Sequence, residues 1–244
     1  MAERVSVRDG ILPIIVVAPH GPDDPRTDII AETIAARIDC HAVINNGWER
    51  ATSVDVANDK ANCNSISHCH EDVVKDEFLD PILRYAYRSS RTIAAARNIS
   101  ISQFLYTPLL ITIHGAGDNA RNLAKSTKLD FIFGNGNGSP NRHSCSIWRK
   151  NALVWALVNK GINVWEGKGG GTYAAWGKDN LNQLFFGKYP GVGESLQIEI
   201  VRVPWRVDDK RAVATGCILA DAIKEVLKIK DFSPFNGDLG LPSC

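Results

Sequence analysis

The sequence predicts a layered α/β domain in a soluble globular protein. Short apolar runs rich in β-branched residues alternate with segments of helical periodicity along the 244 residues, which is typical of a sheet covered by helices. Hydrophobic residues make up 44% and charged residues 23% of the chain, as is ordinary for a globular protein. Because no repeat or low-complexity linker divides a chain of this length, we expect one domain over residues 1–244.

The strands of this domain are predicted from short runs of apolar residues bounded by turn-forming residues. The predicted strands are 13–18, 42–45, 109–113, 130–133, 162–165 and 196–203. The apolar segment that ends at Ala18 is too short to span a bilayer. Pro13 inside it and His20 after it favour a buried strand over the core of a signal peptide.

The helices are predicted from apolar residues at helical spacing. The first would begin at Asp24-Pro25, an N-cap residue followed by proline at the first helical position. A long helical region covers residues 71–97, and Pro81 would kink or split it. Ile30, Ile34 and Ile38 give the first helix an apolar stripe. A third helix is marked by Trp148, Ala152, Trp155 and Val158, and Gly161 ends it. The last predicted helix covers residues 209–228.

Charge and cysteine content limit the expected partners and compartment. The 28 basic and 27 acidic side chains leave a formal charge of +1, which gives no broad field for nucleic acid or a membrane surface. We therefore expect neither as a partner. The six cysteines include no C-x-x-C pair, which argues against a zinc ribbon. Reduced thiols in a cytoplasmic protein are the expectation, and a secreted disulfide framework is the alternative.

Two predicted strands each lead into a histidine. His20 follows the strand that ends at Ala18, and His114 directly follows the run Leu109–Ile113. In open α/β sheets the chemistry gathers beyond the carboxyl ends of the strands. A catalytic zinc ion takes three protein ligands and keeps one open position. Asp23 is the favoured third ligand, since Asp24 before Pro25 suits an N-cap, although Asp24 remains the competing carboxylate.

A glutamate on a third strand is the candidate base. Alternation in Leu196-Gln197-Ile198-Glu199-Ile200 places the three apolar residues on one face and Glu199 on the other. A desolvated carboxylate beside a metal site can act as general base and then pass the proton to the leaving amine. The alternative is a strand whose polar face meets solvent.

Taken together in their order along the chain, these motifs resemble the N-formylglutamate amidohydrolase family. The resemblance covers about residues 13–206. It is carried by Pro19-His20-Gly21, by Val54-Asp55-Val56 with Asn58-Asp59, by Ile113-His114-Gly115, by Asp130-Phe131-Ile132-Phe133-Gly134-Asn135, by Gly170-Gly171-Thr172-Tyr173, and by Leu196-Gln197-Ile198-Glu199-Ile200.

The resemblance implies both a fold and an activity. That family is related to zinc carboxypeptidases and aspartoacylase-like deacylases, so it implies a three-layer α/β/α fold with a mixed, largely parallel central sheet. It implies one zinc ion, or another divalent metal, and hydrolysis of the amide of an N-acyl acidic amino acid or a short peptide-like substrate. On this resemblance His20, Asp23 and His114 would hold the metal, and Glu199 would activate the water.

The sequence departs from the family where a substrate carboxylate would bind. Family members usually carry Asn-Arg-Asp after the central aspartate, whereas this chain has Asp55-Val56-Ala57-Asn58-Asp59-Lys60, without the arginine. Arg50 and Lys60 are candidate substitutes, although lysine lacks the bidentate fork of arginine. The candidate substrate-binding residues are Arg50, Asn58, Lys60 and Tyr173, and Arg121 is a candidate catalytic anion binder. The departure makes a different acyl amino acid a possible substrate.

Two other functions remain open from the sequence. The glycine-rich run 134–138 after a strand imitates a dinucleotide-binding turn, but Ser139 stands where the third glycine is expected and residues 140–144 delay the helix. A nucleotide-binding oxidoreductase is therefore the less favoured alternative. The other is a non-catalytic ligand-binding protein on a hydrolase fold.

Overall fold

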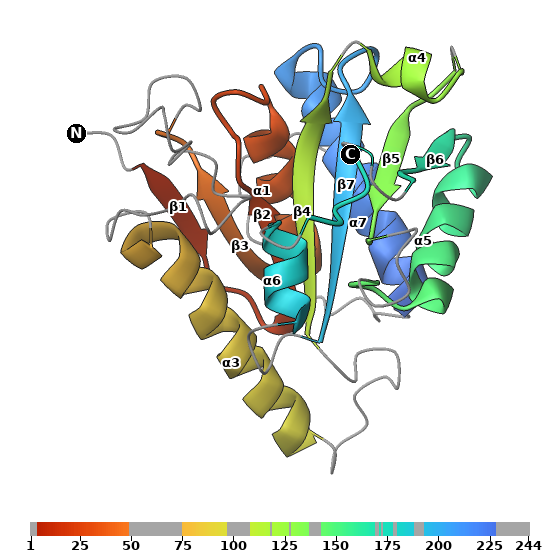
Figure 1. Ribbon diagram of the computed structural model, residues 1–244. Helices are drawn as coiled ribbons and strands as arrows, with labels where there is room; N and C mark the ends of the chain where they lie inside the picture. Colours follow the sequence, from red (N-terminus) through yellow and green to blue (C-terminus); the bar gives the residue numbers. More distant parts are fainter. Residues whose placement is uncertain are drawn as a thin grey trace.

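The computed structural model describes residues 4–48, 75–96, 108–117, 119–126, 128–136, 143–168, 171, 173–177, 180–187 and 193–227. These residues form a mixed sheet with helices on both faces, so the predicted three-layer α/β/α class is confirmed (Figure 1). The strands are β1 (Val5–Arg8), β2 (Leu12–Ala18), β3 (Cys40–Asn45), β4 (Leu109–Ala116), β5 (Phe131–Gly134), β6 (Val164–Glu166) and β7 (Glu194–Val201).

The centre of the sheet is parallel. The strand order is β1-β3-β2-β4-β7-β5-β6. The strands β3, β2, β4 and β7 run in one direction, while β1 is antiparallel to β3 and β5 is antiparallel to β7. The carboxyl ends of four neighbouring strands therefore meet at one edge of the sheet, where the sequence places its histidines.

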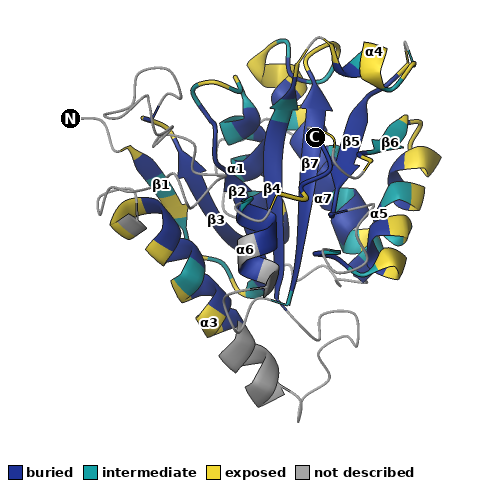
Figure 2. Cartoon of the chain, in the orientation of Figure 1, coloured by how far each residue is buried: buried dark blue, intermediate teal, exposed yellow. Residues whose placement is uncertain are grey.

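Helices cover both faces of this sheet (Figure 2). They are α1 (Thr27–Ile38), α3 (Asp80–Ala96) after a π-helical turn at Lys75–Leu79, α4 (Ala120–Leu123), α5 (Ile147–Asn159), α6 (Leu181–Gly187) and α7 (Asp209–Leu227). Residues of α1, α5 and α7 pack with one face of β2, β4 and β7 in the larger core cluster. Residues of α3 and α6 pack on the opposite face of the sheet.

Alternation along the central strands explains this division. Ile14 and Val16 of β2 belong to the core beneath α1 and α7, whereas Ile15 and Val17 belong to the core beneath α3 and α6. Successive side chains of a strand point to opposite faces, and a parallel strand covered on both sides reads as a continuous apolar run. The predicted stripe of α1 is also confirmed, because Ile30, Ile34 and Ile38 are buried.

One local prediction about the helices was wrong. Helix α1 begins at Thr27, with Arg26 at its N-cap in a left-handed conformation, so Asp24 is not the N-cap residue. In α5 the helix itself is confirmed, but Trp148, Trp155 and Val158 are exposed, and its buried residues include Leu153 and Leu157. The helical region around Pro81 is divided as expected, because the π-helical turn Lys75–Leu79 gives way to α3 at Asp80, and Pro81 lies in the first turn of α3.

The sequence predicts reduced thiols, and one of the described cysteines departs from this prediction. Cys40 and Cys145 are free and buried, and burial raises the pKa of both thiols. Cys217 on α7 is disulfide-bonded, and its partner lies outside the described residues. None of the helices within the described ranges combines the length and apolar character that crossing a bilayer requires.

A buried histidine far from the candidate site makes folding stability depend on pH. The Nδ1 atom of His41 accepts a hydrogen bond from the Gly10 N–H at 3.1 Å, and its ring stacks on Tyr85 at 4.2 Å. Burial first, and then the charge of Arg88, lowers the pKa of His41 from 6.5 to about 4. A proton therefore binds the unfolded chain before it binds the folded protein.

We expect this histidine to weaken the fold in mild acid. Its stabilising contribution is complete above pH 6.5 and is lost as the pH falls toward 4, with a loss of about 1–2 kcal/mol by pH 5. Urea unfolding of the wild type and of His41→Gln at pH 7 and pH 5 measures it. Glutamine can still accept the Gly10 hydrogen bond but does not titrate, so the variant should lose less stability. Equal losses in both proteins would exclude His41 as the cause.

Candidate metal centre

Three central strands deliver the candidate residues to one edge of the sheet. His20 lies two residues beyond the end of β2, His114 lies near the end of β4, and Glu199 lies near the end of β7. His114 and Glu199 are direct partners in the parallel register of β4 and β7. Since β2 also pairs in parallel with β4, the convergence of these residues follows from the topology of the sheet.

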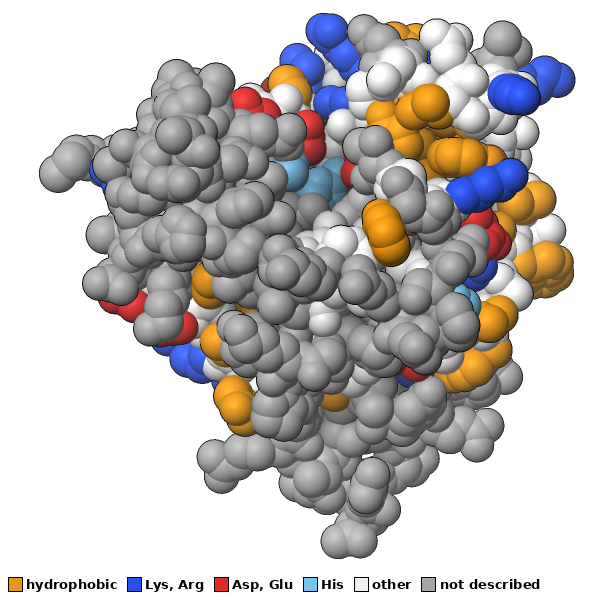
Figure 3. All heavy atoms as spheres, in the orientation of Figure 1, with side chains coloured by type: hydrophobic (Ala, Val, Ile, Leu, Met, Phe, Trp, Pro, Cys, Tyr) orange, Lys and Arg blue, Asp and Glu red, His pale blue; other side chains and the backbone are white. Residues whose placement is uncertain are grey.

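The structure brings His20, Asp24 and His114 into one cluster. Each offers a ligand atom, and these atoms all lie within 4.8 Å of one another. The Oδ2 atom of Asp24 lies 3.4 Å from Nδ1 of His20 and 3.8 Å from Nδ1 of His114. The two imidazole rings meet edge to face, with centroids 4.9 Å apart. Figure 3 shows histidine side chains next to acidic ones at the floor of a hollow in the surface.

Asp24, and not the favoured Asp23, is the carboxylate in this cluster. Asp23 is exposed, whereas the side chain of Asp24 is only 15% exposed. The turn after β2 explains the difference. Its backbone N–H groups at both aspartates donate to the carbonyl of His20 at 2.9 and 2.7 Å, and α1 starts only at Thr27. The Asp24 carboxylate is thus not used for capping and points into the cluster.

The surroundings of Asp24 keep its carboxyl ionised. Burial alone would raise its pKa, but the hydrogen bond with His20 and the nearby charge of His114 lower it. The N–H of Gly115 also donates to Asp24 Oδ2 at 3.0 Å. The net effect is a pKa below the ordinary value of an aspartate. An ionised carboxylate beside two imidazoles is a donor set that suits a divalent metal.

Glu199 is held by a directed chain of hydrogen bonds. It is 7% exposed, and its Oε1 atom accepts from the Gln197 side-chain amide at 3.0 Å. The carbonyl of that amide accepts from Asn180 Nδ2 at 3.4 Å, and Asn180 Oδ1 accepts from the backbone N–H of Asn182 at 2.9 Å. A backbone N–H is always a donor. The Asn182 N–H therefore fixes which atom donates in each hydrogen bond of this series. The last donor of the series is the Gln197 amide, which faces the Glu199 carboxylate.

Tyr173 lies close to both acidic residues of the site. Its hydroxyl donates to Asn119 Oδ1 at 3.2 Å. Burial raises the pKa of Tyr173, and the negative charges of Glu199 and then Asp24 raise it further, against a backbone hydrogen bond with Gly117. A neutral phenol at this position can donate to an oxygen of a bound molecule. The sequence predicts Tyr173 as a substrate-binding residue, and in the structure the charges of Glu199 and Asp24 act on its hydroxyl.

Arg121 is not one of the residues that form the cluster. Arg121 donates to the carbonyls of Val203 at 2.6 Å and Leu129 at 3.4 Å, so its guanidinium joins two loops. The predicted substrate-binding residues Arg50, Asn58 and Lys60 lie outside the described residues.

Sequence reasoning missed three groups that contact the site residues or the residues next to them. They are the backbone N–H of Gly115, the amide of Gln197 and the guanidinium of Arg206, which bonds to the Pro25 carbonyl beside Asp24. Only Gln197 had a signal in the sequence, because it lies two positions before Glu199 and therefore on the same face of the strand. The other two depend on how separate segments pack together.

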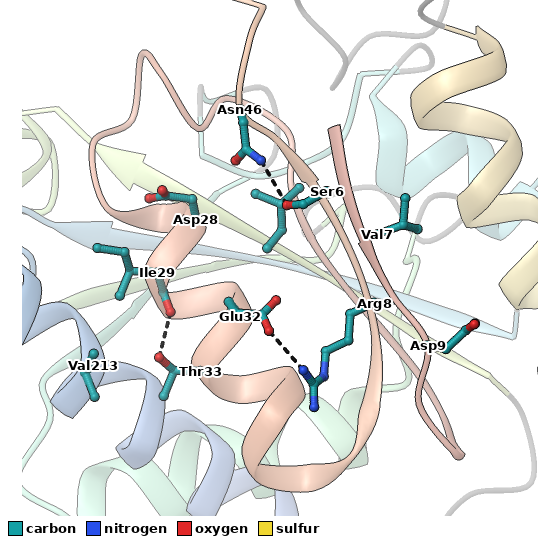
Figure 4. Close-up of a pocket in the computed structure, with 11 residues that line it drawn as sticks. Ser6, Val7, Arg8, Asp9, Asp28, Ile29, Glu32, Thr33, Asn46 and Val213 are labelled. Atoms are coloured by element: carbon teal, nitrogen blue, oxygen red, sulfur yellow. Dashed lines mark hydrogen bonds and ion pairs between the residues drawn. The ribbon is translucent and has the colours of Figure 1, made fainter. Parts of the chain in front are cut away.

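A cleft lies away from this cluster. It has a volume of about 720 Å³ and is lined by residues of β1, β3, α1 and α7. Figure 4 shows Arg8 and Glu32 joined across it by an ion pair, which measures 3.1 Å. None of the cluster residues lines this cleft, so we do not assign the candidate chemistry to it.

Comparisons with known proteins identify the fold. No protein-family model matches the sequence, and no curated protein matches it. Among solved structures, N-formylglutamate amidohydrolase from Ralstonia eutropha superposes with a TM-score of 0.53 at 14% identity, over 93% of this chain and 98% of that one. Bacteriophage poly-gamma-glutamate hydrolase superposes with a TM-score of 0.50 at 16% identity, over 91% and 86% of the two chains.

A third similar structure is described as the zinc-free apo form of YNDL. It has a TM-score of 0.50 at 16% identity, over 92% of this chain and 89% of that one. At these identities the likeness is one of fold, and it agrees with the resemblance of the sequence motifs. The chain therefore has the fold that N-formylglutamate amidohydrolase shares with poly-gamma-glutamate hydrolase.

Proposed function

We propose that this protein is a zinc-dependent hydrolase that cleaves the amide bond of an N-acyl acidic amino acid or a small peptide-like substrate. The observation that carries the proposal is the cluster of His20, Asp24 and His114, with Glu199 in register beside His114. The names of the similar structures support the substrate class, because N-formylglutamate and poly-gamma-glutamate both contain amides of glutamate.

The ligand atoms of the cluster fit a zinc ion. In a tetrahedral site with bonds of about 2.1 Å, neighbouring ligand atoms lie about 3.4 Å apart. The distances from Asp24 Oδ2 to the two Nδ1 atoms are 3.4 and 3.8 Å. His20 and Asp24 come from the turn that follows β2, and His114 comes from the neighbouring strand β4. When bound, zinc would polarise the scissile carbonyl and make a water easier to deprotonate.

The residues of the chain supply the proton transfers and the binding contacts. Glu199 accepts a proton from the attacking water and passes it to the leaving amine. The Gln197 amide donates to Oε1 of Glu199 and so holds the carboxylate in place for this proton transfer. Tyr173 would donate to the substrate by turning its single O–H away from Asn119 Oδ1. Arg50, Asn58 and Lys60 remain candidates for binding the substrate carboxylate, whereas the guanidinium of Arg121 already bonds to the carbonyls of Val203 and Leu129.

The metal content of the purified protein tests this proposal. We expect about one zinc per chain in the wild type and its loss in the His20→Ala/His114→Ala double variant, because two of three ligands are gone. His143→Ala is the control, since His143 lies outside the cluster. The proteins are then assayed with N-acyl amino acids and short γ-glutamyl peptides. If the wild type stays metal-free after zinc is added, the proposed hydrolase function is refuted. Bound metal without turnover would favour a non-catalytic binding protein.

A further inference from the structure

A buried arginine bonds to all three segments that carry the candidate site. Arg206 lies in the connection between β7 and α7 and is only 5% exposed. Its guanidinium donates three hydrogen bonds to backbone carbonyls. Nε donates to Ile200 at 2.9 Å, Nη1 donates to Pro25 at 3.1 Å, and Nη2 donates to Ala116 at 3.2 Å.

Each of these carbonyls is close in sequence to a site residue. Ile200 directly follows Glu199, Pro25 directly follows Asp24, and Ala116 lies two residues after His114. The ladder between β4 and β7 already aligns two of the segments. The turn at residues 19–26 is outside that ladder. Arg206 is thus one of the contacts that tie this turn to the end of the sheet.

Gly115 shows how closely the guanidinium is fitted to the site. A Cβ atom at this position would lie 2.5 Å from Nη2 of Arg206, so only glycine leaves room for the bonded guanidinium. The N–H of the same residue donates to Asp24 at 3.0 Å. Gly115, which directly follows His114, therefore contacts both Arg206 and the Asp24 carboxylate.

We infer that Arg206 is a positioning residue, which sets the relative placement of His114, Asp24 and Glu199 and thereby the affinity of the site for zinc. This inference rests on the proposed function, because that proposal supplies the zinc ion. The planar fork of arginine offers five donors in fixed directions, and no other side chain can reach three carbonyls from different segments in this way. Outer contacts of this kind are generally worth 10- to 100-fold in metal affinity.

The test is Arg206→Lys, which keeps the positive charge but replaces the fork with a single ammonium group. We expect faster amide hydrogen exchange in the metal-free protein at residues 19–26 and 113–117, and a 10- to 100-fold weaker zinc affinity in a chelator competition. Arg149→Lys is the matched control. Arg149 is also buried but pairs with Glu194 at the start of β7, so this change should lower thermal stability without affecting zinc affinity or exchange at those segments.

The outcomes separate this inference from the proposed function. If the wild type binds no zinc, the proposed function fails, and the exchange data alone decide the role of Arg206. Exchange and zinc affinity within threefold of the Arg149→Lys protein would overturn the positioning role. If Arg206→Lys does not fold, Gly115→Ala displaces the guanidinium instead. Its control is Gly177→Ala, whose added Cβ meets nothing within 4 Å. Unchanged exchange and zinc affinity in Gly115→Ala would also overturn the inference.

Discussion

Replacing Glu199 by glutamine is expected to reduce turnover by about a hundred- to ten-thousandfold while zinc stays bound. Glutamine has the shape of glutamate but cannot accept a proton from water. Glu199 is buried, pairs in register with His114 and receives a hydrogen bond from Gln197. The proton transfer that its carboxylate provides should therefore be lost without rearranging the ligands.

The measurement is kcat on whichever N-acyl amino acid the wild type hydrolyses, together with zinc content. Glu194→Gln is a matched control, because Glu194 is buried to the same 7% on the same strand but pairs with Arg149 at the other end. That control should lose stability and keep its turnover per folded molecule. Normal turnover by a folded, zinc-loaded Glu199→Gln protein would remove Glu199 from the mechanism.

The convergence of His20, His114 and Glu199 could be predicted because it depends on sheet topology. Apolar runs identify the strands, and the carboxyl ends of parallel neighbours share one edge. The alternation around Glu199 likewise placed its apolar neighbours in the core. These features rest on the pleat of the strand and the burial of its apolar face, and both can be recognised in a single sequence.

The choice between Asp23 and Asp24 could not be predicted by the same means. The pair Asp24-Pro25 matches the pattern of a helix start, yet α1 begins at Thr27 after Arg26 adopts a φ of 72°. That turn directs Asp24 toward two histidines, one of which is 90 positions away along the chain. Local preference at the helix start is weak compared with such tertiary contacts. For the same reason the contacts of Gly115 and Arg206 could not be predicted from the sequence.

Short or atypical elements were missed for a related reason. Strand β1 has four residues and α6 has seven, so neither gives a long periodic pattern. In α5 the tryptophans that marked the helix face outward, and Arg149 and Lys150 are buried. Ion pairs with Glu194 at 3.2 Å and Glu166 at 2.6 Å accompany that burial. Hydrophobic residues at helical spacing thus revealed the helix but not the face that it buries.

Asp24→Asn and Asp23→Asn provide the sharpest test of the ligand set. We expect the Asp24 variant to bind zinc at least about a hundredfold more weakly, because a neutral amide replaces the charged donor between His20 and His114. The asparagine oxygen can still accept the Gly115 hydrogen bond, which limits the effect on folding. The Asp23 variant removes the same charge one residue away, at an exposed side chain. It should bind zinc as the wild type does.

The measurement is zinc affinity by competition with a chromogenic chelator, with thermal unfolding of each metal-free protein as the check on folding. General electrostatic attraction by the acidic turn would weaken zinc binding equally in both variants. If Asp24 coordinates zinc directly, zinc binding is weakened only in Asp24→Asn. The opposite pattern, with loss only in Asp23→Asn, would mean that the turn rearranges when metal binds and that the helix-start rule had named the correct ligand. The two residues are adjacent and lose the same charge. The difference in zinc affinity between the variants therefore shows which of the two carboxylates points toward the metal.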